Sequence, residues 1–214
     1  MKPAPIKNFG WNDDKAPFYH ECLLPVVESF LPPPSHGVVL DIGCGNGCFV
    51  NRLIGKGYAA YGVDIAADGI ALANRTNPGR FFLCDADTGV LPDPLYGAHI
   101  RTIVSMEVIE HLYSPHAFVK FARRILSASG GGTLILSTPY HGYLKNFFIS
   151  VVDKWDYHWS ALWEGGHIKF WSRRTLTRLL EEEGFCNVRF RCVGRFPYLW
   201  RHMVCRAELV KKTE

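Results

Sequence analysis

The stretch VVLDIGCGNG, residues 38–47, joins a short apolar run to three closely spaced glycines. An apolar run of this length that stops at glycines is typical of a buried strand followed by a sharp turn. The next residues, 49–56, have apolar positions at helical spacing and stop at Gly57. Glycines between a strand and a helix N-terminus let a ligand approach the backbone closely. The stretch therefore predicts a ligand-binding loop at the end of a buried strand.

Outward from this loop, apolar runs alternate with helical patterns. Further strands are predicted at 59–63, 81–84, 100–105 and 133–137, and helices at 66–75 and 115–128. Such alternation is typical of an α/β fold, in which helices cover both faces of a mostly parallel sheet. Ser172 is expected to cap a helix that runs to Glu183. The last two strands, 185–193 and 203–210, are joined by a short turn and are therefore expected to be antiparallel.

Length and composition narrow the class of protein. With 214 residues, the chain has room for one domain, 1–214, beginning with a leader, 1–36, that carries a helix at 17–30. A composition that is 48% hydrophobic and 21% charged excludes a disordered chain. No run approaches the ~18 apolar residues of a membrane-spanning helix, and Met1–Gly10 lacks the apolar core of a signal peptide. The seven cysteines are odd in number and include no C-x-x-C pair, which favours reduced thiols and a cytoplasmic location.

Three aspartates stand near the ends of the first three predicted strands: Asp41, Asp64 and Asp85. A carboxylate at the position of Asp64, 21 residues after Gly43, can accept both hydroxyls of a ribose. The glycine spacing departs from the dinucleotide fingerprint G-x-G-x-x-G because the third position is Cys48. Contacts to ribose without a grip on a pyrophosphate indicate a nucleoside that lacks phosphate, such as S-adenosylmethionine.

Four segments together resemble the class I S-adenosylmethionine-dependent methyltransferases, in the type 11/23 group that includes the ubiquinone-biosynthesis O-methyltransferases. They are VVLDIGCGNG, YGVDIA (61–66), FFLCDAD (81–87) and IVSMEVIEHL (103–112), in matching order and spacing. The resemblance implies a Rossmann-like seven-stranded sheet, order 3-2-1-4-5-7-6 with strand 7 antiparallel, and S-adenosylmethionine as the cofactor. The cofactor-binding residues that it implies are Asp41, Gly43, Cys44, Gly45, Asn46 and Gly47 around the methionine part, Asp64 and Ile65 at the ribose, Asp85 and Ala86 at the adenine, and Ser105 and Met106 beside them. The leader has no arginine, so Lys15 and His20 are the candidates for holding the methionine carboxylate.

The pattern Glu107-x-x-Glu110-His111 follows the fourth predicted strand. These positions would share one face of a helix, where two carboxylates and an imidazole can hold a divalent ion. The pattern is similar to the E-x-x-E-H motif of the ubiquinone-biosynthesis enzymes, which is linked to metal-dependent methylation of a catechol-like hydroxyl. The favoured alternative needs no metal, since many class I enzymes carry an E-H pair here that hydrogen-bonds the backbone.

Residues 140–171 form an aromatic insertion, predicted to be a substrate lid with no clean strand or helix period. The segment holds ten of the 29 aromatic residues, four of the six tryptophans and three histidines. The candidate substrate-binding residues are Tyr140, Tyr143, Trp155, Trp159, Trp163 and Lys169. Phe147–Val152, between Lys145 and Lys154, is either an interfacial segment that touches a membrane or lipid tail, or the apolar side of a lid packed on the domain.

A hydroxyl acceptor loses a proton as it attacks the methyl group, and a histidine suits that task. His167 and His141 are equal candidates for this base, with His111 behind them; alignment without any base is the alternative. The expected function is methyl transfer to a small or lipid-like acceptor, favouring oxygen. The alternatives are methylation of nitrogen, RNA or protein, and an inactive binding module. The place of the N/D-P-P-Y motif of amine-methylating relatives reads Ser105-Met106-Glu107-Val108.

Charge also bears on the partner. Residues 166–214 carry 11 Lys and Arg against 5 Asp and Glu, whereas residues 1–165 carry 13 against 15. The excess is too diffuse for a duplex-DNA face, leaves RNA as a lesser alternative, and suits an acceptor with an anionic group.

Overall fold

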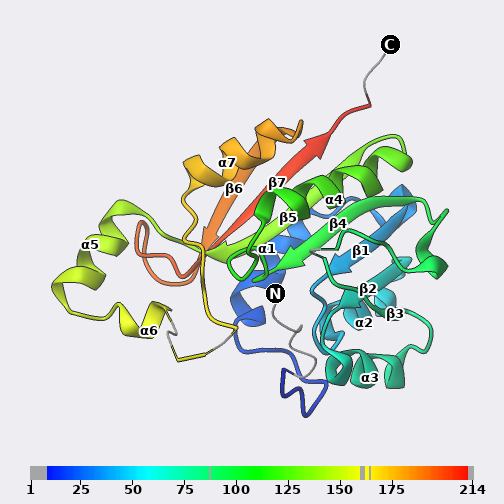
Figure 1. The fold of residues 1–214 in the computed structure, drawn as a ribbon, viewed down its shortest axis with the longest axis horizontal. Helices are drawn as coiled ribbons and strands as arrows, with labels where there is room; N and C mark the ends of the chain where they lie inside the picture. Colours follow the sequence, from blue (N-terminus) through cyan, green and yellow to red (C-terminus); the bar gives the residue numbers. More distant parts are fainter. Residues whose placement is uncertain (1–8, 87, 160–161, 164, 212–214) are drawn as a thin grey trace.

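The computed structural model describes residues 9–86, 88–159, 162–163 and 165–211. They form a seven-stranded sheet with the order β3-β2-β1-β4-β5-β7-β6 (Figure 1). The strands are β1 (Val38–Ile42), β2 (Ala60–Asp64), β3 (Phe81–Leu83), β4 (Ile100–Met106), β5 (Gly132–Pro139), β6 (Cys186–Val193) and β7 (His202–Leu209). β7 runs antiparallel to both neighbours, β5 and β6, and the other pairs are parallel. The predicted fold class, strand order and antiparallel last strand are confirmed.

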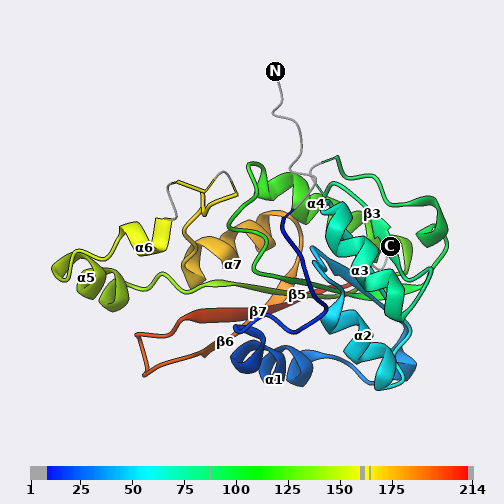
Figure 2. The ribbon, with the colours of Figure 1, turned by 90° about the horizontal axis from the view of Figure 1, so that it is seen from below.

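Helices cover both faces of the sheet, as predicted. They are α1 (His20–Phe30), α2 (Cys48–Gly55), α3 (Ala67–Thr76), α4 (Pro115–Ala128), α5 (Tyr143–Val151), α6 (Asp156–Trp159) and α7 (Arg173–Glu182), with 3-10 turns η1 (Pro34–His36) and η2 (Asp93–Leu95). Buried residues of α1, α2 and α3 share one apolar cluster, and those of α4 and α7 share another. Figure 2 shows α1 and α2 on one side of the sheet and α7 on the other.

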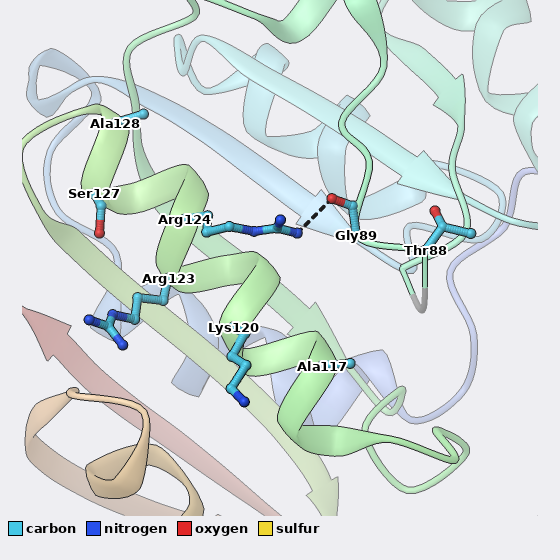
Figure 3. A pocket seen from close by; sticks show the side chains of 8 residues that line it. All are labelled: Thr88, Gly89, Ala117, Lys120, Arg123, Arg124, Ser127 and Ala128. Carbon is cyan, nitrogen blue, oxygen red and sulfur yellow. Dashed lines mark hydrogen bonds between the residues drawn. The ribbon is translucent and has the colours of Figure 1, made fainter.

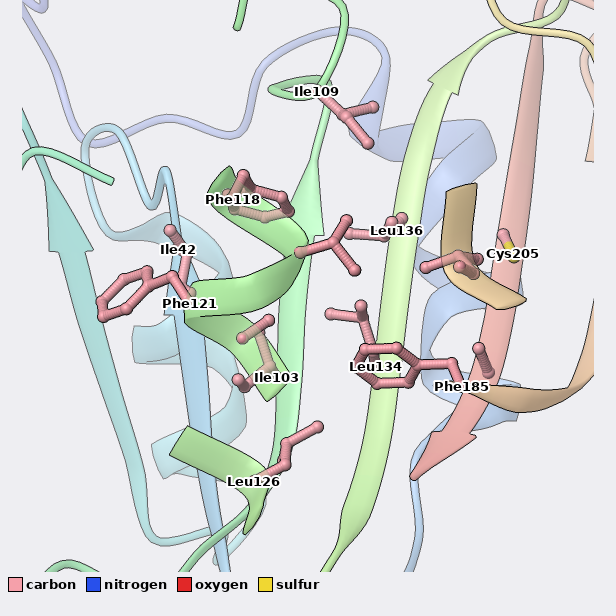
Figure 4. Packing of buried hydrophobic residues seen from close by; sticks show 14 of the residues in the cluster. Ile42, Ile103, Ile109, Phe118, Phe121, Leu126, Leu134, Leu136, Phe185 and Cys205 are labelled. Atoms are coloured by element: carbon pink, nitrogen blue, oxygen red, sulfur yellow. The ribbon is translucent and has the colours of Figure 1, made fainter. Parts of the chain in front are cut away.

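Alternate residues of each strand enter different cores, because successive side chains of a strand point to opposite faces. Val39 packs with α1 and α2, while its neighbour Leu40 packs in the cluster of α4 and α7. In the second cluster, Phe118 and Phe121 of α4 lie against the sheet and Phe185 lies beside β5 (Figure 4). The apolar runs of the strands are therefore buried on both faces of the sheet.

The local start signals of two helices are also observed. The Ser172 hydroxyl accepts the N–H of Thr175 at 3.2 Å, and the Thr175 hydroxyl accepts the N–H of Ser172 at 3.0 Å. This reciprocal pair caps α7 where the sequence predicts. Pro115 occupies the first turn of α4, where its missing N–H costs nothing.

The strand order reverses between β1 and β4. From β1 the chain continues to β2 and β3 on one side, and then to β4 and β5 on the other. Crossovers that leave in opposite directions open a crevice at the carboxyl ends of the two central strands. Asp41 near the end of β1 and Met106 at the end of β4 lie at this edge, which makes it the expected ligand site.

Residues 9–19, here called the strap, lead into α1 across the glycine loop. The Asn46 side chain donates to the carbonyl oxygens of Asp13 (3.0 Å) and Lys15 (2.8 Å). Asp68, in the first turn of α3, accepts the backbone N–H groups of Phe9, Gly10 and Trp11 at 3.3, 2.8 and 2.9 Å. The strap is therefore fastened to two elements that border the crevice.

Residues 140–171, here called the arm, carry α5 and α6 away from the sheet (Figure 1). The sequence of the arm shows no clean helical period because both helices are short. The arm leaves and rejoins the body at one place, since His141 N–H donates to Trp171 O at 3.3 Å. Phe147, Phe148 and Val151 of α5, and Val152 at its C-terminal cap, are exposed rather than packed on the domain. None of the described helices has the length and apolarity needed to cross a bilayer.

Candidate active site

The glycine loop between β1 and α2 has a backbone that only glycine adopts easily. Gly43, Gly45 and Gly47 have φ values of 84°, 53° and 76°. A Cβ on Gly43 would lie 2.3 Å from Val108 Cγ2, and one on Gly45 would lie 2.6 Å from the Trp11 ring. The loop is thus a bare backbone cradle, covered on one side by the strap.

Asp64 fixes this cradle. Its Oδ2 accepts the N–H of Gly45 at 2.7 Å and its Oδ1 accepts the N–H of Ala66 at 2.8 Å. Burial raises the pKa of Asp64, and these backbone hydrogen bonds oppose the rise. The carboxylate at the end of β2 therefore stands directly beside the loop, as a ribose-binding group requires.

Asp41 is the most unusual group at the site. Its side chain is 2% exposed, and within the described residues its Oδ1 has no hydrogen-bond partner. Burial, and then the charge of Asp64, raise the pKa of Asp41 to about 8. A buried acceptor without a partner is costly unless a ligand supplies a donor. An ammonium group is such a donor.

A cavity of about 30 Å³ lies between the strap and the loop. Its lining residues are Trp11, Pro17, Tyr19, His20, Asp41, Gly43, Cys44, Gly45, Asn46, Phe49 and Met106. This volume suits about one water molecule, far less than a nucleoside. The orphaned Asp41 oxygen and the Cβ-free loop fit the methionine end of S-adenosylmethionine, and displacement of the strap would make the room.

The other predicted cofactor residues take varied places. Ser105 is buried and donates to Ile42 O at 2.7 Å, so its hydroxyl ties β4 to β1. Burial raises the pKa of the Cys44 thiol, which keeps it an inert packing group. Ile65, Asp85 and Ala86 are half-buried after β2 and β3 and do not line the small cavity.

Glu110, His111 and His167 meet beside the end of β4. Their candidate ligand atoms lie within 4.8 Å of one another, and the two imidazole rings are 4.8 Å apart. The meeting is built by the backbone, because Glu110 O accepts the N–H groups of Ile168 and Lys169 at 3.0 Å each. His111 Nδ1 donates to Gly166 O at 3.2 Å, which leaves a lone pair on Nε2, 3.9 Å from Glu110 Oε1.

Burial shifts the pKa values of Glu110 and His167 in opposite directions. Glu110 is buried, and burial followed by the charge of Glu107 raises its pKa well above the usual range. Burial and then the neighbouring His111 lower the pKa of His167. A protonated Glu110 carboxyl beside the neutral His167 imidazole can hold and pass a proton without carrying net charge.

Glu107 does not join this cluster, contrary to the helical spacing expected for Glu107, Glu110 and His111. The segment after β4 is a turn, and Glu107 has a φ of 53°. Its Oε2 lies 2.8 Å from His202 Nδ1, and its Oε1 accepts the Ser137 hydroxyl at 2.7 Å. Among the described residues, the groups close enough to share an ion are therefore Glu110, His111 and His167, and not the alternative metal set of Glu107, Glu110 and His111. The sequence carries no signal that His202 is the partner of Glu107.

His141 lies in a different setting, within the base of the arm. It is buried against the Phe170 ring at 4.8 Å and stacked on Trp155 at 6.5 Å. Burial, and then Lys145, lower its pKa to about 4. Lys145 itself is buried and donates to Tyr140 O at 2.7 Å, and burial lowers its pKa to about 8. Lys145 is therefore buried and does not present its ammonium group at the surface beside the arm's apolar segment.

The candidate substrate residues are spread over the arm. Trp163 contacts His111 with ring centroids 5.5 Å apart, and Tyr140 is buried against Trp200. Tyr143 is exposed, and Trp155 Nε1 donates to Ser150 Oγ at 2.9 Å. Lys169 lies over the Tyr113 ring at 5.8 Å. The side chain of Trp159 lies outside the described part of the chain. Trp163 is thus the aromatic residue that the fold brings to the Glu110 cluster.

A second hollow, of about 850 Å³, lies between α4 and the loop that follows β3 (Figure 3). It is open and edged by Lys120, Arg123 and Arg124, and Arg124 is tied to Gly89 O at 2.7 Å. None of its lining residues comes from the carboxyl ends of β1 or β4. It is not the ligand site of this fold.

A glycine cradle, carboxylates at the ends of β1 and β2, and a sheet with one antiparallel strand define a class I S-adenosylmethionine-dependent methyltransferase, an enzyme that uses this cofactor. A family model described as "Methyltransferase domain" matches residues 18–189. The chain belongs to this methyltransferase family, which confirms the resemblance and the cofactor.

Relatives and solved structures agree with this. The ubiquinone biosynthesis O-methyltransferase of Glaesserella parasuis is 26% identical over 190 residues, covering 82% of this chain and 78% of the relative. That of Cereibacter sphaeroides is 30% identical over 172 residues, covering 79% and 68%. A Thermotoga maritima structure, described as a possible histamine N-methyltransferase, has a TM-score of 0.65 at 19% identity over 91% of this chain and 90% of that chain. The structural likeness concerns the fold.

Proposed function

We propose that the protein transfers the methyl group of S-adenosylmethionine to a hydroxyl oxygen of a small or lipid-like acceptor. The observation that carries the proposal is the cluster of Glu110, His111 and His167 beside the end of β4. When a hydroxyl oxygen attacks the sulfonium methyl group, the hydroxyl proton is released and a base can accept it. The neutral thioether S-adenosylhomocysteine leaves without protonation, so the reaction needs no acid. The names of the relatives as O-methyltransferases support the choice of oxygen.

When bound, the cofactor supplies an electrophilic methyl group on sulfonium. Asp41 and the Gly43–Gly47 loop would hold its methionine end, and Asp64 would hold its ribose. His167, kept neutral near pH 7 by its lowered pKa, would accept the acceptor's proton. His111 lies against the His167 ring and would orient it. His141, in its aromatic enclosure, would shape the acceptor pocket; it remains the alternative base.

The test measures methyl transfer from labelled S-adenosylmethionine to phenols, catechols and the matching anilines. His167→Gln is expected to lower kcat by about 10²- to 10⁴-fold on the hydroxyl acceptors, the usual range for a lost general base. Its affinity for S-adenosylhomocysteine should not change. His116→Gln is the control, because His116 lies in the first turn of α4 and pairs with Glu183. Faster transfer to the anilines would reject oxygen as the acceptor, and full activity of His167→Gln would reject its role.

A metal at Glu110, His111 and His167 is the rival use of the same cluster. These atoms are close enough to share one ion, but a protonated Glu110 is a poor ligand. We therefore expect turnover to survive dialysis against EDTA. Loss of turnover, with recovery on adding back Mg²⁺ or Zn²⁺, would instead favour the metal-dependent reaction.

The arm is proposed to be the acceptor lid, and its exposed apolar residues on α5 support an acceptor or location at a lipid surface. Three apolar side chains of α5, Phe147, Phe148 and Val151, and that of Val152 at its C-terminal cap are exposed. Wild-type protein should sediment with phospholipid vesicles, and Phe147→Ser/Phe148→Ser should not. Vesicle binding that is equal in both proteins would reject this role for α5.

A further inference from the structure

The cavity under the strap has an acid on one wall and two neighbouring donors on another. Asp41 supplies the acid from β1. Tyr19 and His20 supply a phenol and an imidazole from the junction of the strap and α1. His20 is 6% exposed, and within the described residues its Nδ1 has no hydrogen-bond partner. Orphaned polar atoms thus face one small space from two elements.

The methionine end of S-adenosylmethionine carries an ammonium and a carboxylate. Asp41 suits the ammonium, so the carboxylate still needs donors. Among the residues that the structure describes, no lysine or arginine side chain lines the cavity. Lys15, the cationic candidate from the sequence, is 83% exposed and points to Asp13, 4.0 Å away. Within the described part of the chain, the groups left to receive the carboxylate are therefore neutral donors.

We propose that Tyr19 and His20 together receive the methionine carboxylate of the cofactor, in place of a cationic side chain. Both side chains line the cavity together with Asp41, Tyr19 from the end of the strap and His20 from the start of α1. Their neighbouring rings, 5.0 Å apart and nearly perpendicular, present two separate donors to one carboxylate. The assignment concerns the cofactor and does not depend on which acceptor the enzyme uses.

The charges around the pair are consistent with this role. Burial, and then the carboxylates of Glu107, Glu110, Asp41 and Asp64, raise the pKa of Tyr19, so its hydroxyl keeps the proton that it donates. Burial lowers the pKa of His20 to about 4, with Glu107 opposing. The imidazole is therefore neutral in the closed cavity and still carries one N–H. Two neutral donors avoid placing an unpaired buried cation there before the cofactor arrives.

The test compares two ligands by isothermal titration. S-adenosylhomocysteine carries the amino-acid end, and 5′-methylthioadenosine has the same adenosine and sulfur without it. Tyr19→Phe and His20→Gln are each expected to weaken S-adenosylhomocysteine about 10- to 100-fold, the range for a lost hydrogen bond to a charged group. Affinity for 5′-methylthioadenosine should stay the same. Lys15→Gln, the matched control in the strap, should change neither.

Tyr19→Phe keeps the ring and its contacts, so it reports on the hydroxyl even if His20→Gln unfolds. An equal loss for both ligands would mean that the two side chains only support the fold, and would overturn the proposal. Unchanged affinity for S-adenosylhomocysteine would also overturn it, as would a selective loss in Lys15→Gln. If wild-type protein bound neither ligand, the cofactor itself would be wrong for this chain.

Discussion

Replacing Asp41 by asparagine should stabilise the fold increasingly as the pH rises, while removing cofactor binding. The Asp41 carboxyl is fully buried, and its pKa rises from 3.8 to about 8 because burial and Asp64 disfavour its charge. Below pH 4 the group is protonated in folded and unfolded chains alike and costs nothing. Between pH 4 and 8 the unfolded chain releases the proton and the folded chain keeps it, so stability falls with pH. Above pH 8 the loss is complete.

The size of this effect follows from the pKa values. Each pH unit between 3.8 and the folded pKa costs about 1.4 kcal/mol. At pH 7 the burden is therefore about 4 kcal/mol, a large part of the ~5–15 kcal/mol that holds a domain folded. Asparagine carries no titrating group, and its own burial cost is the same at every pH. The difference in unfolding free energy, variant minus wild type, should grow by about 3 kcal/mol from pH 5 to pH 7.5.

Urea unfolding at several pH values measures this difference, provided that the m-value is the same for both proteins. Asp14→Asn, at an exposed position of the strap, is the matched control. Titration with S-adenosylhomocysteine should show a loss of affinity in Asp41→Asn at every pH. Parallel stability curves for variant and wild type would refute the reasoning, because Asp41 would then be ionised in the folded protein. Retained affinity would refute its role toward the ammonium.

Three further results are expected. Gly47→Ala should destabilise the protein by about 2–4 kcal/mol in urea unfolding, because φ is 76° and the new Cβ would lie 2.4 Å from Ala73 Cβ. Gly57→Ala, with a φ of 85° and open space around it, is the control that measures the cost of backbone strain alone. Equal destabilisation by the two variants would contradict a clash between the new Cβ and Ala73. Ser172→Ala should cost about 1 kcal/mol by thermal or urea unfolding through loss of the α7 cap, and a neutral result would show that the cap is dispensable. Trp11→Ala should speed the association of S-adenosylhomocysteine in stopped-flow measurements, since the indole covers Gly45; an unchanged rate would mean that the strap does not limit entry.

The sheet and its flanking helices could be predicted because each has a local signature. Val38–Ile42 is apolar and stops at glycine, and Ser172 caps its helix through a residue three positions later. Strand order followed from the resemblance, since alternation alone does not say which strands are neighbours. The bounds of the arm's helices could not be predicted, because a helix as short as α6, Asp156–Trp159, spans hardly more than one turn.

The candidate site likewise contains residues that could be predicted from the sequence and residues that could not. Asp41, Asp64 and the glycine loop lie within short motifs and could be named from the sequence. The pairing of Glu107 with His202 could not, because 95 positions separate them and only the antiparallel β7 brings them together. Tyr19 also escaped, since one tyrosine before a helix carries no signal of what it covers. Burial then decides the protonation of each group, and burial is a property of the whole fold.

The arm's two ends are hydrogen-bonded neighbours, with His141 donating to Trp171 across 30 positions of chain. A segment with adjoining ends can be lengthened, shortened or exchanged without moving β5 or α7, provided that the contacts of residues 163–169 with Glu110 and His111 are kept. Chimeras that swap residues 142–170 between relatives offer a direct way to ask whether acceptor choice is inherited separately from the methyl-donor machinery. Such a junction would allow the arm, and with it the choice of acceptor, to change during evolution while the cofactor-binding residues stay the same.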